Sequence, residues 1–336
     1  MDFALTLGAA VTSQSAPILI PWWAWGGFLL FITAMLALDL GVFHKTDKAL
    51  PFKEAISWCA VWISLAAIFG GLIWWGENAE TAQIYAAGYL LELALSVDNL
   101  FVFLMVFSFF KVPEEFQHRV LFWGILGAVI MRALFILGGV TLVSKFGFLM
   151  FVFGAFLIVT GIKMALPEKE DAKDLEKNIF VRLGRKVFPV TGELRGHHFF
   201  VKEAGRWIAT PLFLVLLVIE GTDVIFAVDS IPAVMGILPK DMPYQTKLFV
   251  AFTSNIFAIL GLRSLFFALA GFMKYFRFLK IGLSFILVFI GVKIILAQGI
   301  DFHIPTLVSL GVLGVILALS VVASVALPKK ETNSPH

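Results

Sequence analysis

Charged residues are scarce in this 336-residue sequence: Lys, Arg, Asp and Glu make up 15% of it, against about a quarter in an average soluble domain. Hydrophobic residues make up 60%, and the mean hydropathy is +0.94. So few charged side chains cannot cover a surface that faces water on all sides. The composition therefore predicts a protein embedded in a bilayer, and no nucleic acid partner is expected. The net charge of +3 is small, so its distribution along the chain matters more than its size.

Cysteine and the common catalytic motifs are also lacking. Cys59 is the one cysteine, which excludes an intrachain disulfide and any metal site built from several cysteines. We expect Cys59 to be a buried small residue of an apolar run. The sequence has no HExxH, GxSxG or CxxC motif, so we predict no enzyme activity. Residues 1–16 carry no basic segment ahead of their short apolar stretch, so no cleavable signal peptide is expected.

Long apolar runs, in contrast, are abundant. A membrane-spanning helix needs about 20 mostly apolar residues, and several of the runs have Trp at their ends, as residues at a membrane interface do. We predict an all-α, polytopic membrane protein with about nine spanning helices, of which the third and sixth are long enough to be tilted or broken. The predicted spans are 22–43, 55–75, 82–110, 118–143, 146–166, 210–238, 247–270, 277–297 and 304–327.

Basic residues are distributed unevenly between the two sets of connecting loops. One set, with its flanking helix ends, holds only Lys145, Lys240 and Lys247. Because basic loops stay on the cytoplasmic side, we predict the N-terminus outside and the C-terminus in the cytoplasm. The loops predicted to be cytoplasmic, which hold most of the Lys and Arg, are 44–54, 111–117, 167–209, 271–276 and the tail after 327.

The segment 167–209 is the one sizeable polar stretch, and it mixes acidic and basic residues. It is too short for an independent catalytic domain. We interpret it as a cytoplasmic linker with a solvated helix, and the alternative is a segment that binds a partner or regulates the protein.

An internal repeat links two parts of the chain. Asp98 and Asp229 both follow a valine, both precede a polar residue, and lie 131 residues apart, as do Arg132 and Arg263. Each copy holds three spans, so the second copy enters the membrane from the opposite side, a plan that recurs in secondary transporters. The predicted divisions are an N-terminal two-helix extension (1–81), the first repeat (82–166), the polar loop (167–209), the second repeat (210–297), and a final helix and tail (298–336).

Ionisable residues inside the predicted spans are the main functional signal. Each such charge costs about 2.5–3.5 kcal/mol at the centre of a helix on insertion scales, so the groups must pair, titrate or bind an ion. The carboxylates outnumber the cations, so ion pairs between them leave an excess of negative charge. A bound divalent cation or protons would balance that excess. The carboxylates are Asp39, Glu92, Asp98, Glu220, Asp223 and Asp229, and the cations are Arg132, Lys163, Arg263 and Lys293.

The repeated acids are the best candidates for ion ligands. Asp98 is followed by Asn99 and Asp229 by Ser230, and Asn255 is a further oxygen donor in a predicted span. An unwound segment near these acids would turn more oxygens inward. A set of oxygen donors without cysteine suits Mg²⁺, Ca²⁺ or Mn²⁺, and the reluctance of Mg²⁺ to lose water favours the other two. The four cations are expected to pair with or orient the carboxylates, although the two lysines lie close enough to helix ends to extend to the interface.

The acidic motifs resemble those of the TerC family of integral membrane proteins and, within it, the Alx-like group. They are ALDLGVFHK at 37–45, ELALSVDN at 92–99 and EGTDVIFAVDSIPA at 220–233. The resemblance covers about residues 20–327. It implies manganese export across the bacterial inner membrane, in a response to alkaline pH or in metal and tellurium resistance. It also implies that the metal-binding centre includes Asp39, Glu92, Asp98, Asn99, Glu220, Asp223 and Asp229.

From these observations we predict a secondary transporter that exports Mn²⁺, coupled to protons, with no permanently bound cofactor. Its partners would be the bilayer, the metal ion and protons, with Arg132, Arg263, Lys163, Lys293 and Ser230 in supporting roles. The alternatives are a transporter of another cation such as Ca²⁺ or of a small organic solute, and a membrane scaffold of a metal- or tellurite-resistance system that recruits partners through 167–209.

Overall fold

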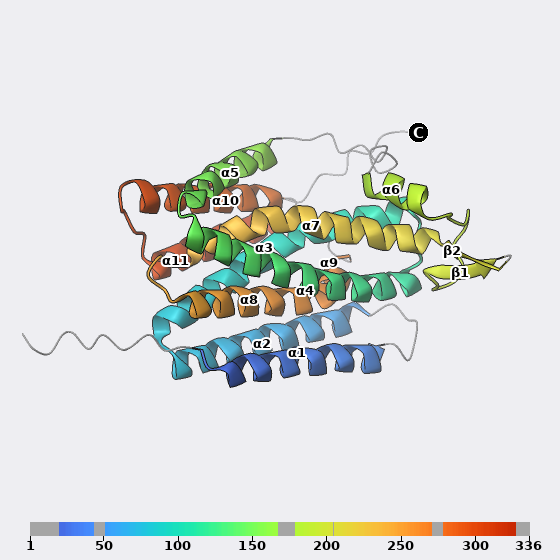
Figure 1. Cartoon of the computed structure of the whole chain (residues 1–336), viewed down its shortest axis with the longest axis horizontal. Helices are drawn as coiled ribbons and strands as arrows, with labels where there is room; N and C mark the ends of the chain where they lie inside the picture. The colour runs from blue at the N-terminus through green and yellow to red at the C-terminus, as the bar shows by residue number, and fades with distance from the viewer. Residues whose placement is uncertain (1–19, 44–50, 167–178, 204, 271–277, 327–336) are drawn as a thin grey trace, which may run out of the picture.

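The structure is a computed structural model that describes residues 20–43, 51–166, 179–203, 205–270 and 278–326, without the side chains of 38–43 and 325. Its helices lie side by side as a bundle, and successive long helices run in alternating directions (Figure 1). The elements are α1 (Trp22–Phe43), α2 (Phe52–Gly76), α3 (Ala79–Phe109), α4 (Glu114–Lys145), α5 (Leu149–Ala165), α6 (Ile179–Val187), β1 (Phe200–Glu203), β2 (Arg206–Ala209), α7 (Pro211–Ile237), α8 (Tyr244–Leu260), α9 (Leu262–Ala270), α10 (Leu279–Gly299) and α11 (Thr306–Ala326).

The helices confirm the predicted polytopic membrane architecture. Within the described residues, seven helical stretches are long and apolar enough to cross a bilayer, and two shorter apolar helices, Trp22–Ala37 and Leu149–Ala165, accompany them. Each predicted span corresponds to one long helix, except the seventh, which is divided between α8 and α9. The exposed Trp22 lies at the start of α1, and the exposed Trp74 and Trp75 lie at the end of α2. Tryptophan side chains at helix ends are typical of a membrane–water interface.

The two three-helix segments pack in a reciprocal manner. Helix α3 packs against α8, and α7 packs against α4, so the first helix of each segment contacts the second helix of the other. A Cβ atom on Gly88 of α3 would lie 2.8 Å from the Ser254 hydroxyl of α8, and a Cβ atom on Gly124 of α4 would lie 3.1 Å from Ile219 of α7. Gly88 and Ile219 are themselves 131 residues apart. This pairing is the one that two repeats related by a twofold axis would make.

The third helices of the two segments, α5 and α10, form the closest helix pair. They run antiparallel, because Gly154 approaches Gly291 while Gly161 approaches Ser284. A Cβ atom on Gly291 would lie 2.6 Å from the carbonyl oxygen of Gly154. Such close backbone contact needs residues without side chains, as in many helix interfaces within membranes.

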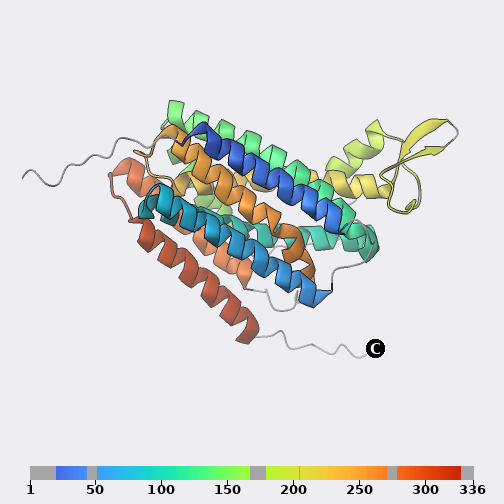
Figure 2. The same cartoon turned by 90° about the horizontal axis from the view of Figure 1, so that it is seen from below.

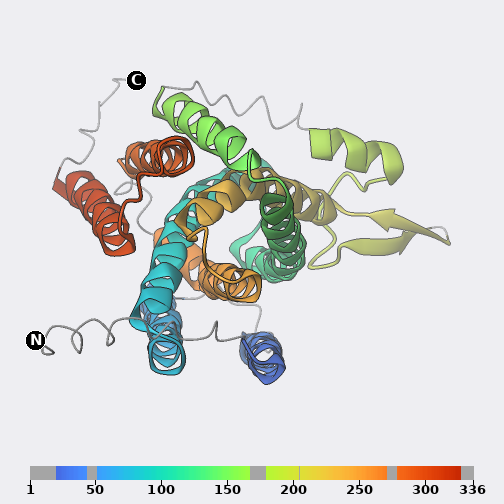
Figure 3. The same cartoon turned by 60° about the vertical axis from the view of Figure 1, so that its left-hand side comes forward.

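The remaining long helices lie around this core. Helix α1 packs aromatic residues such as Phe28 against Phe249, Phe252 and Phe257 of α8. Helix α2 lies against α3 and α9, and α11 lies against α3 and α10 (Figure 3). Cys59 is half-buried on α2, not buried as predicted, because α2 covers the bundle from outside and keeps one side exposed.

The long helices differ from the prediction in where they are interrupted. Helices α3 and α7 are continuous through Asp98 and Asp229, so the expected unwound segments are absent from both. Pro232 lies inside α7 without ending it. The interruption lies instead at Gly261, between α8 and α9. In an apolar environment the backbone groups of α7 have no water to bond. They therefore bond to one another, which favours a continuous helix.

The polar loop carries more structure than a solvated linker. After α6, strands β1 and β2 form an antiparallel hairpin in which Phe200 pairs with Ala209. Helix α6 and the hairpin lie together at one end of the bundle (Figures 1 and 2). The hairpin is not evident from the sequence, because its strands have only four residues each.

Candidate functional site

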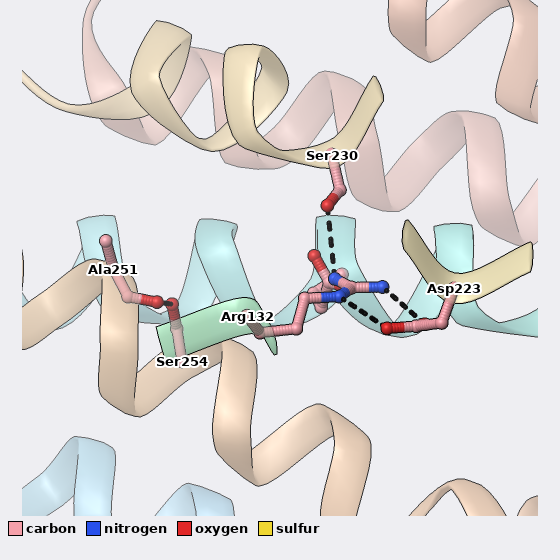
Figure 4. A network of polar contacts seen from close by, with 6 residues as sticks. Arg132, Asp223, Ser230, Ala251 and Ser254 are labelled. Atoms are coloured by element: carbon pink, nitrogen blue, oxygen red, sulfur yellow. Dashed lines mark hydrogen bonds and ion pairs between the residues drawn. The ribbon is translucent and has the colours of Figure 1, made fainter. Parts of the chain in front are cut away.

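Arg132 lies at the centre of the polar site. It belongs to α4, and its side chain is only 1% exposed. One guanidinium nitrogen donates to Glu92 of α3 and to the Ser230 hydroxyl of α7 at 3.1 Å. The other terminal nitrogen donates to Asp223 of α7 at 3.2 Å, as Figure 4 shows. One cation therefore joins three helices and both repeats.

This network accounts for two of the predicted carboxylates. A guanidinium has five N–H donors in a fixed plane, which lets Arg132 reach Glu92 and Asp223 together. Both acids are buried, and an isolated buried charge would be costly. The network still carries one more carboxylate than cation, and the second carboxylate oxygen of Glu92 has no hydrogen-bond partner among the described residues.

The repeated acids Asp98 and Asp229 come together from α3 and α7. Their carboxyl groups are near enough for their charges to interact. Within the part of the chain that the structure describes, Asp229 makes no hydrogen bond or ion pair of its own, whereas Asp98 does have a polar interaction. Asn99 and Ser230, which follow the two acids, are both buried. The structure therefore places the equivalent acids of the two repeats within electrostatic reach of each other.

The backbone carbonyl that precedes Asp229 in the sequence is a further candidate oxygen donor. Pro232 has no N–H group, so it cannot donate the helical hydrogen bond to the carbonyl of Val228. Val228 immediately precedes Asp229. A carbonyl freed in this way within a membrane helix is available to a bound ion or to water.

Glu220 lies one helical turn before Asp223, on the same face of α7, and the two carboxyl groups interact electrostatically. Its carboxyl group packs on Gly127 of α4, where a Cβ atom would overlap the carboxylate. Glu220 is partly exposed, and among the described residues it makes no hydrogen bond or ion pair. Gly127 therefore makes room for a carboxyl group that no cation neutralises.

Asn255 on α8 is a second polar group without a partner. It is 1% exposed, and neither its side-chain oxygen nor its nitrogen is hydrogen-bonded to any described residue. A buried amide without partners costs stability. Its helix packs against α3 and α4, which carry Glu92 and Arg132.

The other predicted residues are divided between the core and the ends of the bundle. Arg263 is buried on α9, and one of its terminal nitrogens lacks a hydrogen bond to the described residues. Lys163 is exposed at the end of α5, as extension to the interface predicts. Lys293 is buried and lines a cavity of about 220 Å³ together with Glu80 and His303. The side chain of Asp39 lies outside the described residues.

The predicted ligands are not assembled into one acidic cluster. Within the described residues, no group of three or more His, Cys, Asp or Glu side chains is arranged to hold a metal ion. Glu92 and Asp223 are bound to Arg132 instead. The remaining two acids, Asp98 and Asp229, lie within electrostatic reach of each other, and the residues that follow them, Asn99 and Ser230, also carry side-chain oxygens.

The chain is similar in sequence to a family of membrane proteins and to several individual proteins. Residues 77–332 match the family described as "Integral membrane protein TerC family". An "Uncharacterized membrane protein STKORF319" of Myxococcus xanthus is 49% identical over 302 residues, which cover 89% of this chain and 91% of that protein. Proteins named "Putative membrane-bound redox modulator Alx" are 45% identical in Photorhabdus laumondii (94% of this chain, 97% of that one) and 44% in Escherichia coli K12 (88% and 92%). No solved structure matches the chain with significance.

Proposed function

Because this chain belongs to the TerC family of integral membrane proteins, we propose that it is a secondary transporter that exports Mn²⁺ across the inner membrane in exchange for protons. The observation that carries the proposal is the meeting of Asp98 and Asp229 from equivalent positions of the two repeats. In transporters built from inverted repeats, the binding site lies near the middle of the membrane, where the repeats meet.

The chemistry of the donors supports a hard divalent cation as the substrate. Two carboxylates, the Asn99 amide, the Ser230 hydroxyl and the Val228 carbonyl are all oxygen donors. Such donors suit Mn²⁺ and Ca²⁺, and Mg²⁺ gives up its water less readily. Two adjacent carboxylates also offer the double negative charge that a divalent cation balances.

The ion pairs of Arg132 with Glu92 and Asp223 argue against these two acids as permanent metal ligands. A guanidinium bound to both acids takes the place that a cation would need between them. We propose that Arg132 keeps these two acids neutralised in the described conformation and that the ion binds first at Asp98 and Asp229. Glu220, which packs on Gly127, would carry a proton or complete the site during transport.

Proton exchange follows from how carboxylates bind metals. A carboxyl group must lose its proton before it ligates a cation, so ion binding releases protons and proton binding releases the ion. A pH gradient across the membrane would then drive export. This coupling also offers a physical route to a role at alkaline pH.

The printed name of several relatives suggests a redox role for those proteins, but the residues of this chain do not favour a thiol-based one. Cys59 is its one cysteine, so the chain cannot form an intrachain disulfide. The polar centre instead consists of carboxylates, an amide, a hydroxyl and a guanidinium.

The test is metal flux in liposomes that contain the purified protein. Mn²⁺ entry is followed by quenching of an enclosed dye, and pH by a second enclosed indicator. We expect Mn²⁺ movement with opposite proton movement, and a loss on the order of tenfold or more in Asp98→Asn/Asp229→Asn, since even residues that only support metal ligands change affinity by that much.

The matched control is Lys145→Gln, which removes an exposed charge from the end of a membrane helix and should keep full flux. Equal flux in the double variant and the wild type, with both proteins folded, would contradict the proposed site. Flux of Ca²⁺ that excludes Mn²⁺ would contradict the proposed substrate. No flux of any cation would favour the scaffold alternative.

A further inference from the structure

Helix α6 lies against the side of a membrane helix, not apart from the bundle. It packs on α7 through Val181 and Gly184, which are both buried. A Cβ atom on Gly184 would lie 2.6 Å from Leu214 and 3.0 Å from Leu217. The glycine therefore lets the two helices approach closely along one face of α6.

The contact extends well into α7. Phe180, at the start of α6, covers Gly221, where a Cβ atom would lie 2.5 Å from the ring. Gly221 is ten residues after Pro211, the first residue of α7, which corresponds to about 15 Å along the helix axis. Helix α6 therefore lies beside the first three turns of α7. Since α7 is one of the helices suited to cross a bilayer, this position is at the expected depth of the membrane interface.

The outer surface of α6 is divided between an apolar and a basic face. Ile179, Leu183 and Val187 recur every fourth residue and so form one stripe along the helix. Their exposed fractions are 70%, 55% and 60%. Three large aliphatic side chains in line are an unfavourable surface for water and a favourable one for acyl chains. Arg182, Arg185 and Lys186 occupy the remaining face.

A cavity next to α6 adds a place for a phosphate group. It has a volume of about 770 Å³ and lies between the α3–α4 turn, α6 and the segment before the hairpin. Lys111 and Arg185 line it with basic side chains, Phe109 and Leu214 with apolar ones, and Glu193 is the acid among its described lining residues. Basic pockets beside membrane helices commonly hold the head groups of anionic lipids.

We propose that α6 is an interfacial membrane helix and that this end of the bundle binds an anionic phospholipid. The stripe formed by Ile179, Leu183 and Val187 faces the acyl chains of the bilayer, and the phosphate of an anionic headgroup lies between Lys111 and Arg185 on the other side of the helix. Amphipathic helices with basic residues beside an apolar stripe bind membrane interfaces in this way. The lipid would hold α6 over Gly221, next to Glu220, on the outside of the polar centre. The inference does not depend on which ion the protein transports.

Spin-label accessibility tests the position of α6 in the membrane. In a Cys59→Ser background, a nitroxide is placed at Leu183→Cys, and the protein is reconstituted into phosphatidylglycerol-containing bilayers. Ile162→Cys, exposed on the apolar surface of α5, and Arg206→Cys, exposed on β2, are the lipid-facing and water-facing references. We expect position 183 to collide with oxygen more than with a water-soluble nickel complex, as position 162 does.

A label at 183 that behaves like the one at 206 would overturn the proposal, because α6 would then face water. A label shielded from both reagents would overturn it as well, because a second copy of the chain would then cover the stripe.

Native mass spectrometry tests the headgroup site. We expect the wild-type protein to retain phosphatidylglycerol in preference to phosphatidylcholine, and Lys111→Gln/Arg185→Gln to lose that preference. The control is Lys145→Gln/Lys240→Gln, which removes two charges at or just beyond the other ends of α4 and α7 and should keep the preference. Equal retention of phosphatidylglycerol by wild type and by the Lys111→Gln/Arg185→Gln variant would overturn the headgroup site.

Discussion

Arg132 determines the electrostatic balance of the core at the scale of single residues. Its guanidinium neutralises Glu92 and Asp223 in a region where an uncompensated charge has little water to solvate it. The bond to Ser230 also connects this network to the residue that follows Asp229. Any change at Arg132 therefore affects both the stability of the bundle and the surroundings of the Asp98–Asp229 pair.

Replacement of Arg132 by Met should lower the free energy of unfolding by about 3–5 kcal/mol, since breaking a buried ion pair leaves its partner charged and unpaired. Thermal unfolding in detergent measures the effect. Arg132→Lys should recover part of the loss, because an ammonium keeps the charge but cannot reach three acceptors in one plane. A Met variant as stable as Lys145→Gln would contradict this role.

Gly127 controls the position of Glu220. An added methyl group would overlap the Glu220 carboxyl group, so Gly127→Ala should displace that group and reduce Mn²⁺ flux at least severalfold if Glu220 takes part in transport. Gly138→Ala on the same helix is the control, because nothing lies within 4 Å of its Cβ position. Full flux in Gly127→Ala would exclude a role for the present position of Glu220.

At the scale of elements, the α5–α10 pair depends on contact between backbones. Gly154, Gly161 and Gly291 lie where the two helices come within contact distance of each other's main chain. In a bilayer this packing replaces the hydrophobic effect as the source of association between helices. The pair is therefore a rigid unit that joins the two repeats.

Gly291→Val should destabilise the protein by about 1–3 kcal/mol or more, as overpacking does in a well-packed core. Two main-chain atoms lie within reach of its Cβ position, so a side-chain rotation cannot relieve the clash. Thermal unfolding provides the measurement, and Gly299→Val, at the end of the same helix with only Phe151 nearby at 3.8 Å, is the matched control. Similar unfolding temperatures for the two variants would contradict the rigid pair.

At the scale of the whole molecule, the alternating helices leave α6 and the β1–β2 hairpin at one end of the bundle, together with the turn between α3 and α4 (Figure 1). The basic residues of α6 and Lys111 also lie at this end. The positive-inside tendency therefore predicts that this end of the bundle faces the cytoplasm.

Reporter fusions test this orientation. A fluorescent protein fused after residue 326 should fluoresce, and alkaline phosphatase at the same place should be inactive. A phosphatase fused after Asp301, between α10 and α11, should be active, since that connection lies at the opposite end. The reverse pattern would place the N-terminus in the cytoplasm.

The sequence by itself determined the membrane class and the positions of the long helices. Apolar runs of about 20 residues have few alternatives to a spanning helix, because a bilayer leaves backbone groups no other partner. The acidic motifs also contain Glu92 and Asp223, which the structure brings together at Arg132, since charge is too costly within a membrane to occur without a role.

Only the tertiary structure decided which of these charges meet. The sequence shows Arg132 and Asp223 as distant residues, and their contact depends on the packing of α4 against α7. The glycine contact of Glu220 and the packing of α6 on α7 depend on the same three-dimensional arrangement. A local sequence pattern indicates that a charge needs a partner or that an apolar stripe needs an apolar environment. The partner itself depends on how helices that are far apart in the sequence pack together.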